Sequence, residues 1–129
     1  MQTNASISAD NKLPVAIGPY RQSAAAGGLL FLSGQIPIDP ATGALVAGGI
    51  EEQTAQVMKN ISAILAASGL GLENVVKTTV LLADMSLFAA MNTVYGEAFK
   101  SAPPARSTFA VKELPRGALV EIECVAAAG

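Results

Sequence analysis

Residues 103–108 read Pro103-Pro104-Ala105-Arg106-Ser107-Thr108 and open an extended segment near the C-terminal end of the chain. The two prolines disfavour a helix, because the proline ring fixes φ and removes a backbone N–H. Over residues 106–111 polar and apolar side chains alternate, which predicts a β-strand. Arg106 then lies at the mouth of a strand, where its planar guanidinium suits a carboxylate. The alternative is a surface arginine in a weak ion pair.

A second strand is predicted after this one, over residues 119–126, beyond a turn at residues 114–117. Because the connection is short, we expect the two strands to pair antiparallel. Side chains alternate between the two faces of a strand, so Glu121 and Glu123 share one face. These carboxylates are either simply solvated or able to approach Arg106, within one subunit or from another.

Before the prolines, the sequence predicts two amphipathic helices separated by a buried strand. Apolar residues recur at helical spacing over residues 50–68 and again up to about residue 100. Gly69 suits the C-terminal end of the first helix. Residues 75–82 are β-branched and aliphatic, which predicts a buried strand.

The first part of the chain predicts a β-hairpin. Residues 20–26 and 29–33 are compatible with two short strands, and Gly27 and Gly28 form a two-residue turn between them. Residues 45–46 are compatible with a further short strand. The element order ββαβαββ predicts an α+β fold, with two helices on one face of a mixed β-sheet.

The composition favours a single domain over residues 1–129 that packs against copies of itself. Hydrophobic residues make up 51% and charged residues 14%, which is apolar and charge-poor for a soluble monomer. The net charge of −2 and the lack of a Lys/Arg block argue against a nucleic-acid partner. No apolar run spans a bilayer and residues 1–10 do not form a signal peptide, so we expect a cytoplasmic protein without a membrane partner. Residues 1–13 are polar, and we expect them to be loosely ordered.

The chain contains no histidine, which excludes histidine-based metal sites, Ser-His-Asp triads and histidine general bases. Its one cysteine excludes an internal disulfide and a Cys-x-x-Cys metal site. Cys124 lies in an apolar run, so we expect a buried thiol rather than a reactive one. Proton transfer then depends on a carboxylate, a tyrosine, a lysine, the cysteine or water. We expect neither a metal nor a cofactor.

Five short motifs occur in order along the chain. They are Ile17-Gly18-Pro19-Tyr20, Leu32-Ser33-Gly34-Gln35-Ile36-Pro37, Val75-Val76-Lys77-Thr78-Thr79-Val80, Pro104-Ala105-Arg106-Ser107 and Val120-Glu121-Ile122-Glu123. Each motif alone is weak, but the five at these spacings resemble the RidA (YjgF) family of reactive-intermediate deaminases. The resemblance covers residues 14–127.

The resemblance implies a chorismate-mutase-like α+β fold and a homotrimer, in which three sheets form a central barrel and the sites lie between subunits. It also implies an enzyme, a 2-iminobutanoate/2-iminopropanoate deaminase. Such enzymes hydrolyse enamine and imine intermediates, for example 2-aminoacrylate and 2-aminocrotonate, to 2-keto acids and ammonia. Pyridoxal-phosphate-dependent serine and threonine dehydratases release these intermediates. The implied ligands are therefore small 2-imino and 2-keto acids.

Matched residue by residue, the resemblance implies two catalytic groups. Arg106 would grip the substrate carboxylate, and Glu121 would position the attacking water. Six further residues would bind substrate or line its cleft: Tyr20, Ser33, Gly34, Phe88, Asn92 and Thr108. Several family members carry cysteine in place of Thr108, so a backbone contact there is kept and a thiol role is lost. Structural alternatives are a hydrogen-bonded interface tyrosine at Tyr20 and a strand-end cap at Ser33.

The implied chemistry suits these residue types. A protonated imine is already electrophilic, so orientation of substrate and water supplies much of the acceleration, and Glu121 does the general-base work. The main alternative is a trimeric ligand-binding or regulatory module for small carboxylates, which needs Arg106 but not Glu121. Ribonuclease activity, assigned to some family members, is disfavoured by the acidic charge and the missing histidines. Nothing in the sequence is diagnostic of a chaperone-like role.

Overall fold

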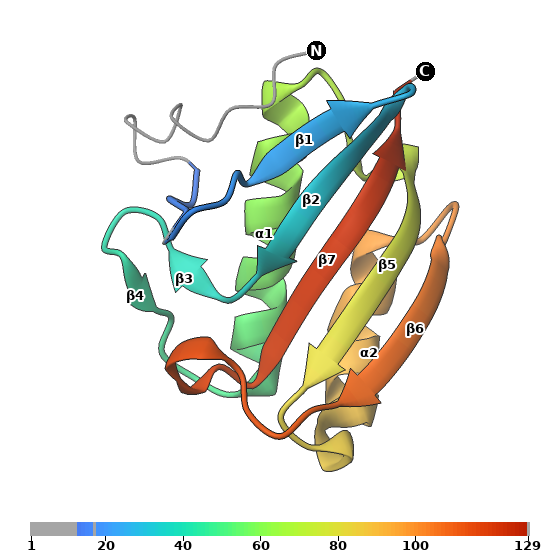
Figure 1. The fold of residues 1–129 in the computed structure, drawn as a ribbon. Coiled ribbons are helices and arrows are strands. Elements are labelled where there is room, and N and C mark those ends of the chain that lie inside the picture. The colour runs from blue at the N-terminus through green and yellow to red at the C-terminus, as the bar shows by residue number, and fades with distance from the viewer. Residues whose placement is uncertain (1–12, 17, 129) are drawn as a thin grey trace.

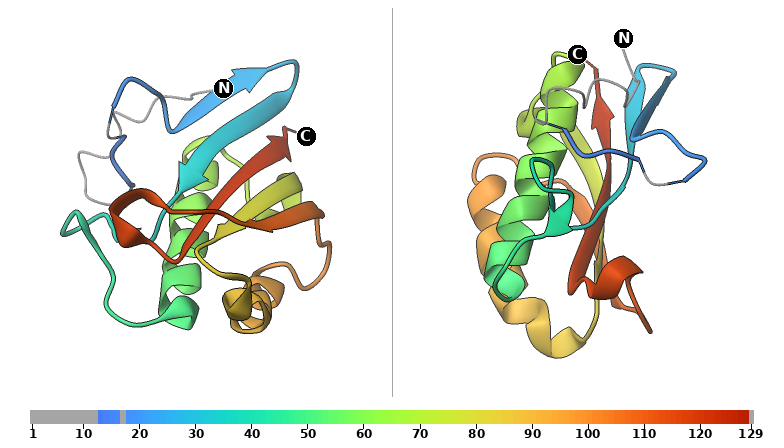
Figure 2. Two further views of the ribbon diagram at one scale, coloured as in Figure 1. Left: turned by 60° about the horizontal axis from the view of Figure 1, so that its bottom comes forward. Right: turned by 90° about the vertical axis from the view of Figure 1, so that its left-hand side faces the viewer.

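The computed structural model describes residues 13–16 and 18–128, which form a sheet layer and a helix layer. Its elements are β1 Ser23–Ala26, β2 Leu29–Gln35, β3 Ile38–Asp39, β4 Ala44–Leu45, α1 Ile50–Ala67, β5 Val75–Leu82, α2 Phe88–Ala98, β6 Ala105–Ala110 and β7 Val120–Ala127. A five-stranded sheet has the order β1-β2-β7-β5-β6, and β3 pairs with β4 in a second, two-stranded sheet. Figures 1 and 2 show both helices on one face of the larger sheet. The predicted α+β arrangement is confirmed.

The β1–β2 hairpin turns at Gly27 and Gly28, as predicted. Their φ angles are 59° and 80°, a left-handed pair that residues with a Cβ rarely adopt. The first strand begins at Ser23 and is shorter than predicted. Upstream of it, the Tyr20 amide donates a hydrogen bond of 2.9 Å to the Gly18 carbonyl, so Tyr20 lies in a tight turn and not in the sheet.

Strand β2 extends beyond its predicted end, through a β-bulge. Its regular pairing with β7 stops after Leu32 and resumes at Gln35. The buried Gln35 side chain donates a hydrogen bond of 2.7 Å to the Gln22 side-chain oxygen, which fixes the far end of the bulge. Ser33 and Gly34 therefore lie in the irregular part of the strand, where side chains can be aimed differently from those of the regular ladder.

Helix α1 packs across the sheet and supplies much of the core. The Glu52 side chain accepts a hydrogen bond of 2.9 Å from the Gly49 amide at its first turn, and Gly69 (φ 75°) follows its last turn. The predicted helix over residues 50–68 is confirmed. Its buried apolar side chains are Ile50, Val57, Met58, Ile61, Ile64 and Leu65.

Helix α2 is shorter than predicted. The Asp84 carboxylate accepts a hydrogen bond of 2.8 Å from the Ser86 amide and so caps a 3₁₀ turn, η3 (Met85–Leu87). The α-helix itself begins only at Phe88. Asp84 therefore caps the turn that precedes the helix, and not the helix itself.

The predicted antiparallel pairing of the two C-terminal strands is wrong. Strand β6 pairs in parallel with β5, while β7 pairs antiparallel with the other side of β5 (Figure 1). The connection over residues 111–119 is too long for a tight hairpin and carries the chain past the end of β5. The Val111 amide donates to the Leu82 carbonyl at 2.9 Å, and the Ala83 amide donates to the Leu119 carbonyl at 3.0 Å. The apolar β7 thereby gains two neighbours for its backbone groups.

The two faces of the larger sheet differ in what covers them. The helices cover one face and bury alternate residues of β7, among them Ile122 and Cys124. No described element covers the opposite face, which we call the open face (Figure 2). Phe31, Val76 and Phe109 are 44%, 47% and 55% exposed. This much apolar exposure on one chain fits the expectation of packing against other copies.

The prediction of loose order over residues 1–13 falls almost entirely outside the described residues. Leu13, where the description begins, is 6% exposed and belongs to the core. The predicted trimer concerns contacts between chains and stays a prediction. Over residues 13–16 and 18–128, no helix has the length and apolar character needed to cross a membrane.

Candidate functional site

The residues predicted for the site fall into two clusters. The arginine cluster consists of Arg106, Phe88, Asn92 and Thr108 on β6 and α2. The glutamate cleft contains Tyr20, Ser33, Gly34 and Glu121.

The arginine cluster lies where the edge strand β6 meets α2. Arg106 is paired with Thr78, whose side chain is buried on the helix-covered face, so Arg106 points to that face too. Its Nη1 donates a hydrogen bond of 2.7 Å to Asn92 Oδ1. The guanidinium carbon lies 5.5 Å from the centre of the Phe88 ring and 4.7 Å from that of the Tyr95 ring. A guanidinium has five N–H donors, so it can bind a carboxylate while it keeps the bond to Asn92.

Thr108 follows Arg106 on the same face of β6. It is paired with Val80, which is fully buried, and its hydroxyl oxygen is buried without a hydrogen bond to the described part of the chain. The side chain therefore packs inward. Since β6 is the edge strand, the backbone groups on its outer side are not used by the sheet and suit the predicted backbone contact.

The glutamate cleft has a volume of about 510 Å³ and is lined by residues of β2, β7 and the turns around Tyr20 and Arg116. The Ser33 hydroxyl donates a hydrogen bond of 2.6 Å to the Arg21 carbonyl, which fixes its oxygen at the wall. The Tyr20 side chain is 46% exposed. Such a cleft, with a few polar groups on an apolar wall, suits a small polar ligand. Over residues 13–16 and 18–128, no three Cys, Asp or Glu side chains are placed to share a metal ion.

Gly34 permits the close approach of the Glu121 carboxylate to β2. A Cβ at position 34 would lie 2.8 Å from the carboxyl carbon of Glu121 and still closer to one of its oxygens. Burial raises the pKa of Glu121, and the charge of Glu123 raises it further. A carboxylate with a raised pKa is a better proton acceptor than an ordinary glutamate, which suits general-base work.

Gly34→Ala is expected to displace the Glu121 carboxylate, because the new methyl group would occupy its place. We expect the pKa of Glu121 to fall as the carboxyl gains solvent, and the free energy of unfolding to fall by about 1–3 kcal/mol. NMR titration of the glutamate carboxyl carbons and urea denaturation measure the two effects. Gly96→Ala is the matched control, because a Cβ at that helical position meets nothing within 4 Å. An unchanged Glu121 titration at wild-type stability would contradict the close packing.

The two clusters face opposite sides of the sheet. Glu121 is paired with Leu81, and Leu81 with Phe109, all on the open face, whereas Arg106 shares the helix-covered face with Thr78. Arg106 is level with Thr78 and Glu121 with Leu81, and these two positions are about 10 Å apart along β5. Strands β6 and β7 lie on either side of β5 and are therefore also about 10 Å apart. One small ligand therefore cannot touch both groups in one chain.

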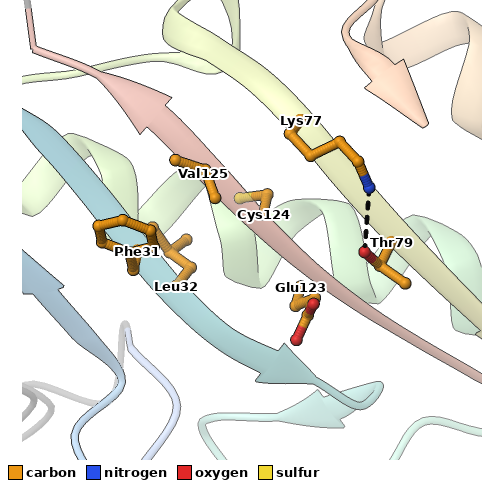
Figure 3. Close-up of a pocket in the computed structure, with 7 residues that line it drawn as sticks. All are labelled: Phe31, Leu32, Lys77, Thr79, Glu123, Cys124 and Val125. Carbon is orange, nitrogen blue, oxygen red and sulfur yellow. Dashed lines mark hydrogen bonds between the residues drawn. The ribbon is translucent and has the colours of Figure 1, made fainter. Parts of the chain in front are cut away.

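A smaller hollow of about 170 Å³ lies on the open face (Figure 3). Lys77 Nζ donates hydrogen bonds there to the Thr79 hydroxyl at 3.3 Å and to the Thr78 carbonyl at 2.9 Å. Glu123 lines both this hollow and the glutamate cleft, so its charge acts on both. Cys124 is buried, as predicted, and burial raises the pKa of its thiol to about 12, which disfavours the reactive thiolate. The lining residues are Phe31, Leu32, Lys77, Thr79, Glu123, Cys124 and Val125.

Three residues near the predicted groups were not predicted for the site. Tyr95 contacts Arg106 but reads in the sequence as part of the apolar stripe of a helix. Glu123 was placed on the face of Glu121 without a role. Arg116 lines the glutamate cleft with a left-handed φ of 59°, and its guanidinium donates a hydrogen bond of 3.1 Å to the Gly43 carbonyl. Nothing in the sequence around Arg116 indicates a left-handed φ, which residues with a Cβ seldom adopt.

Comparisons with known proteins agree over nearly the whole chain. The family model described as Endoribonuclease L-PSP matches residues 11–128. A RutC family protein of Pyrococcus horikoshii is 53% identical over 113 residues, 88% of this chain and 90% of that protein. The 2-iminobutanoate/2-iminopropanoate deaminase of Homo sapiens is 48% identical over 118 residues, 92% of this chain and 86% of that protein.

Solved structures show the same fold. RidA from the Antarctic bacterium Psychrobacter sp. PAMC 21119 matches with a TM-score of 0.89 at 38% identity, covering 98% of this chain and 99% of that one. E. coli TdcF with bound serine matches with a TM-score of 0.87 at 37% identity, covering 92% of this chain and 95% of that one. The similarity thus includes the strands and the helix that carry both clusters.

Proposed function

This chain belongs to the Endoribonuclease L-PSP (RidA/YjgF) family, and we propose that it hydrolyses 2-imino acids, and the enamines that give rise to them, to 2-keto acids and ammonia. Its relatives include both imine deaminases and proteins of the RutC family, so the choice of reaction depends on the site. The observation that carries the proposal is that one chain presents both of the groups the reaction needs. These are the Arg106 guanidinium, held by Asn92, and the Glu121 carboxylate, whose pKa is raised by burial. These are the two groups that a carboxylate-bearing imine and its attacking water require.

In the proposed reaction, Arg106 binds the substrate carboxylate and fixes the C=N carbon near the glutamate cleft. Glu121 accepts a proton from water as the water oxygen bonds to that carbon. The adduct of the protonated imine then carries a hydroxyl and an amino group on one carbon. Glu121 passes its proton to the nitrogen, the C–N bond breaks as the hydroxyl oxygen forms the C=O bond, and the departing ammonia takes up the hydroxyl proton. Tyr20 and Ser33 bind substrate or water beside Glu121. The products, a 2-keto acid and ammonia, balance the imino acid and one water.

The site is proposed to form between chains. Because Arg106 and Glu121 face opposite sides of one sheet, the Arg106 of one chain has to meet the Glu121 of another. We propose a homotrimer in which the open faces form a central barrel, so that each arginine cluster reaches the glutamate cleft of a neighbour. The exposed Phe31 and Phe109 support this assembly, since it would bury them. A cytoplasmic location is part of the same proposal.

A second candidate function is binding of small amino-acid-like ligands without turnover. The observation that favours it is the solved structure of TdcF, which was obtained with bound serine. A binding module would need the arginine cluster but not the base at Glu121. The two candidate functions therefore differ in whether they require the Glu121 carboxylate.

A coupled assay tests the proposal. A serine or threonine dehydratase generates the enamine in place, and formation of the 2-keto acid is followed with and without this protein. We expect acceleration by the wild-type chain and none by Glu121→Gln. Acceleration that survives in Glu121→Gln would contradict the role of that residue. Saturable binding of serine without acceleration by the wild type would favour the binding module.

Glu123→Gln is expected to move the acid limb of the pH profile of kcat/KM to lower pH. Glu121 acts as a base only when it is ionised, so activity falls as the pH drops through its pKa. Burial raises that pKa and the charge of Glu123 raises it further, so removing the charge lowers it. Glu97→Gln makes the same charge change on α2, outside the cleft. Equal shifts in the two variants, or no shift in Glu123→Gln, would contradict the coupling.

A further inference from the structure

The Arg106 guanidinium lies against the ring of a buried tyrosine. Its carbon is 4.7 Å from the centre of the Tyr95 ring, within the range of about 6 Å over which a cation is attracted to an aromatic face. Phe88 provides a second ring at 5.5 Å. Phe88 is only half-buried, at the first residue of α2, whereas Tyr95 is 5% exposed and lies deeper in the helix.

The tyrosine is itself fixed from two sides. Its hydroxyl shares a hydrogen bond of 2.6 Å with the Thr78 hydroxyl, and both groups are buried. Thr78 is the residue of β5 that pairs with Arg106, so the bond joins α2 to the sheet at the level of the guanidinium. The Tyr95 ring also packs against Phe99, just past the end of α2, with 4.8 Å between the ring centres. A ring held in this way has little freedom to move.

We propose that Tyr95 is a positioning residue that holds the Arg106 guanidinium ready for the substrate carboxylate. The inference rests on the proposed function of Arg106. An arginine side chain has several rotatable bonds, and a carboxylate that binds two of its N–H groups needs one orientation of the fork. Asn92 binds one nitrogen of that fork, and the Tyr95 ring lies against the guanidinium carbon. Binding then costs less conformational entropy than it would with a free side chain.

Two variants of Tyr95 separate this role from core packing. Tyr95→Phe keeps the ring under the guanidinium and loses the bond to Thr78, while Tyr95→Leu loses the ring and keeps an apolar side chain. Phe99→Leu is the matched control, because it removes a buried ring next to Tyr95, just past the end of α2, and Phe99 has no described contact with the guanidinium. All kinetic measurements are made well below the melting temperature of the least stable variant.

We expect Tyr95→Leu to raise KM for 2-iminobutanoate about tenfold and to change kcat less than about threefold, because a poorly held arginine weakens carboxylate binding before and during reaction alike. We expect Tyr95→Phe and Phe99→Leu to stay within about twofold of the wild type. Equal effects of Tyr95→Leu and Phe99→Leu on KM would overturn the proposal, since both then act through packing. So would a Tyr95→Phe variant as impaired as Tyr95→Leu.

An NMR measurement on the free protein makes the test independent of turnover. Protons on the side chain of Arg106 that lie over the Tyr95 ring are expected to be shifted upfield by its ring current. The shift should persist in Tyr95→Phe and Phe99→Leu, and in Tyr95→Leu it should shrink to the smaller part that the more distant Phe88 ring produces. Absence of the shift in the wild type would overturn the inference even if the enzyme is active. If the protein proves inactive, the proposed function fails, and the shift still decides the positioning role.

Discussion

Arg106→Ala is expected to lower kcat/KM for 2-imino acid hydrolysis by roughly 10²–10⁴-fold, the effect of removing one partner of a hydrogen-bonded charge pair. The substrate carboxylate would lose a charged, two-pronged donor in a pocket that offers no described cation to replace it at the same place. Arg106→Lys keeps the charge but loses the planar fork, so we expect an intermediate activity. The chain should remain folded, because Arg106 is only half-buried and its partner Asn92 is exposed.

The coupled dehydratase assay measures this loss, and thermal unfolding shows whether the fold is kept. Lys112→Ala is a suitable control, because it removes a positive charge from an exposed residue outside both clusters. Titration with 2-oxobutanoate adds a measure of carboxylate binding without turnover. Near-wild-type kcat/KM in Arg106→Ala would contradict the assignment of this residue. If Arg106→Ala loses both activity and secondary structure, the result would mean that Arg106 stabilises the fold and does not act by binding the ligand.

The local chemistry of the chain was sufficient to predict most of its elements. Gly27 and Gly28 identified the hairpin, because each has to adopt a left-handed φ. The apolar period of 3.6 residues identified α1, and Gly69 marked its end. These features depend only on residues that are close together in the sequence, so they can be predicted without the fold.

The sheet order was not predictable in the same way. Two strands joined through residues 111–119 can pair with each other or lie on either side of a third, and no local feature distinguishes the two. The choice of β5 as the common neighbour depends on burial of apolar β7 at the centre of the sheet. The consequence for the site is large, because this order determines which faces Arg106 and Glu121 use.

The sequence names candidate residues for the site but not their geometry. The family motifs mark Arg106 and Glu121 as candidates by position, and the structure adds how each side chain is held. The Gly34 contact with Glu121 depends on a bulge, and the Tyr95 contact with Arg106 depends on the packing of α2 against β6. Both arise from contacts between distant segments. Tyr95 in particular has the spacing of a core residue, and its contact with the Arg106 guanidinium cannot be predicted without the fold.

The proposed site between chains makes a strong prediction for mixtures of inactive chains. Glu121→Gln alone is expected to lower kcat by roughly 10²–10⁴-fold, because the water loses its general base while the arginine cluster stays intact. Arg106→Ala lacks the proposed carboxylate-binding group instead and keeps Glu121. If each site joins Arg106 of one chain to Glu121 of the next, a ring that contains both variants has one intact site. A random equal mixture in trimers should then recover about a quarter of the wild-type sites.

The mixture is prepared by unfolding and refolding the two variants together, with each variant refolded alone for comparison. Wild type refolded with the double variant Arg106→Ala/Glu121→Gln controls for exchange of chains, and its activity should fall from about half to about a quarter of the wild-type value when the chains mix freely. A site contained within one chain predicts no recovery in the first mixture and half activity in the control. Recovery near a quarter in both would mean that the arginine and the glutamate act on one substrate from two chains, as their places on opposite faces of the sheet require.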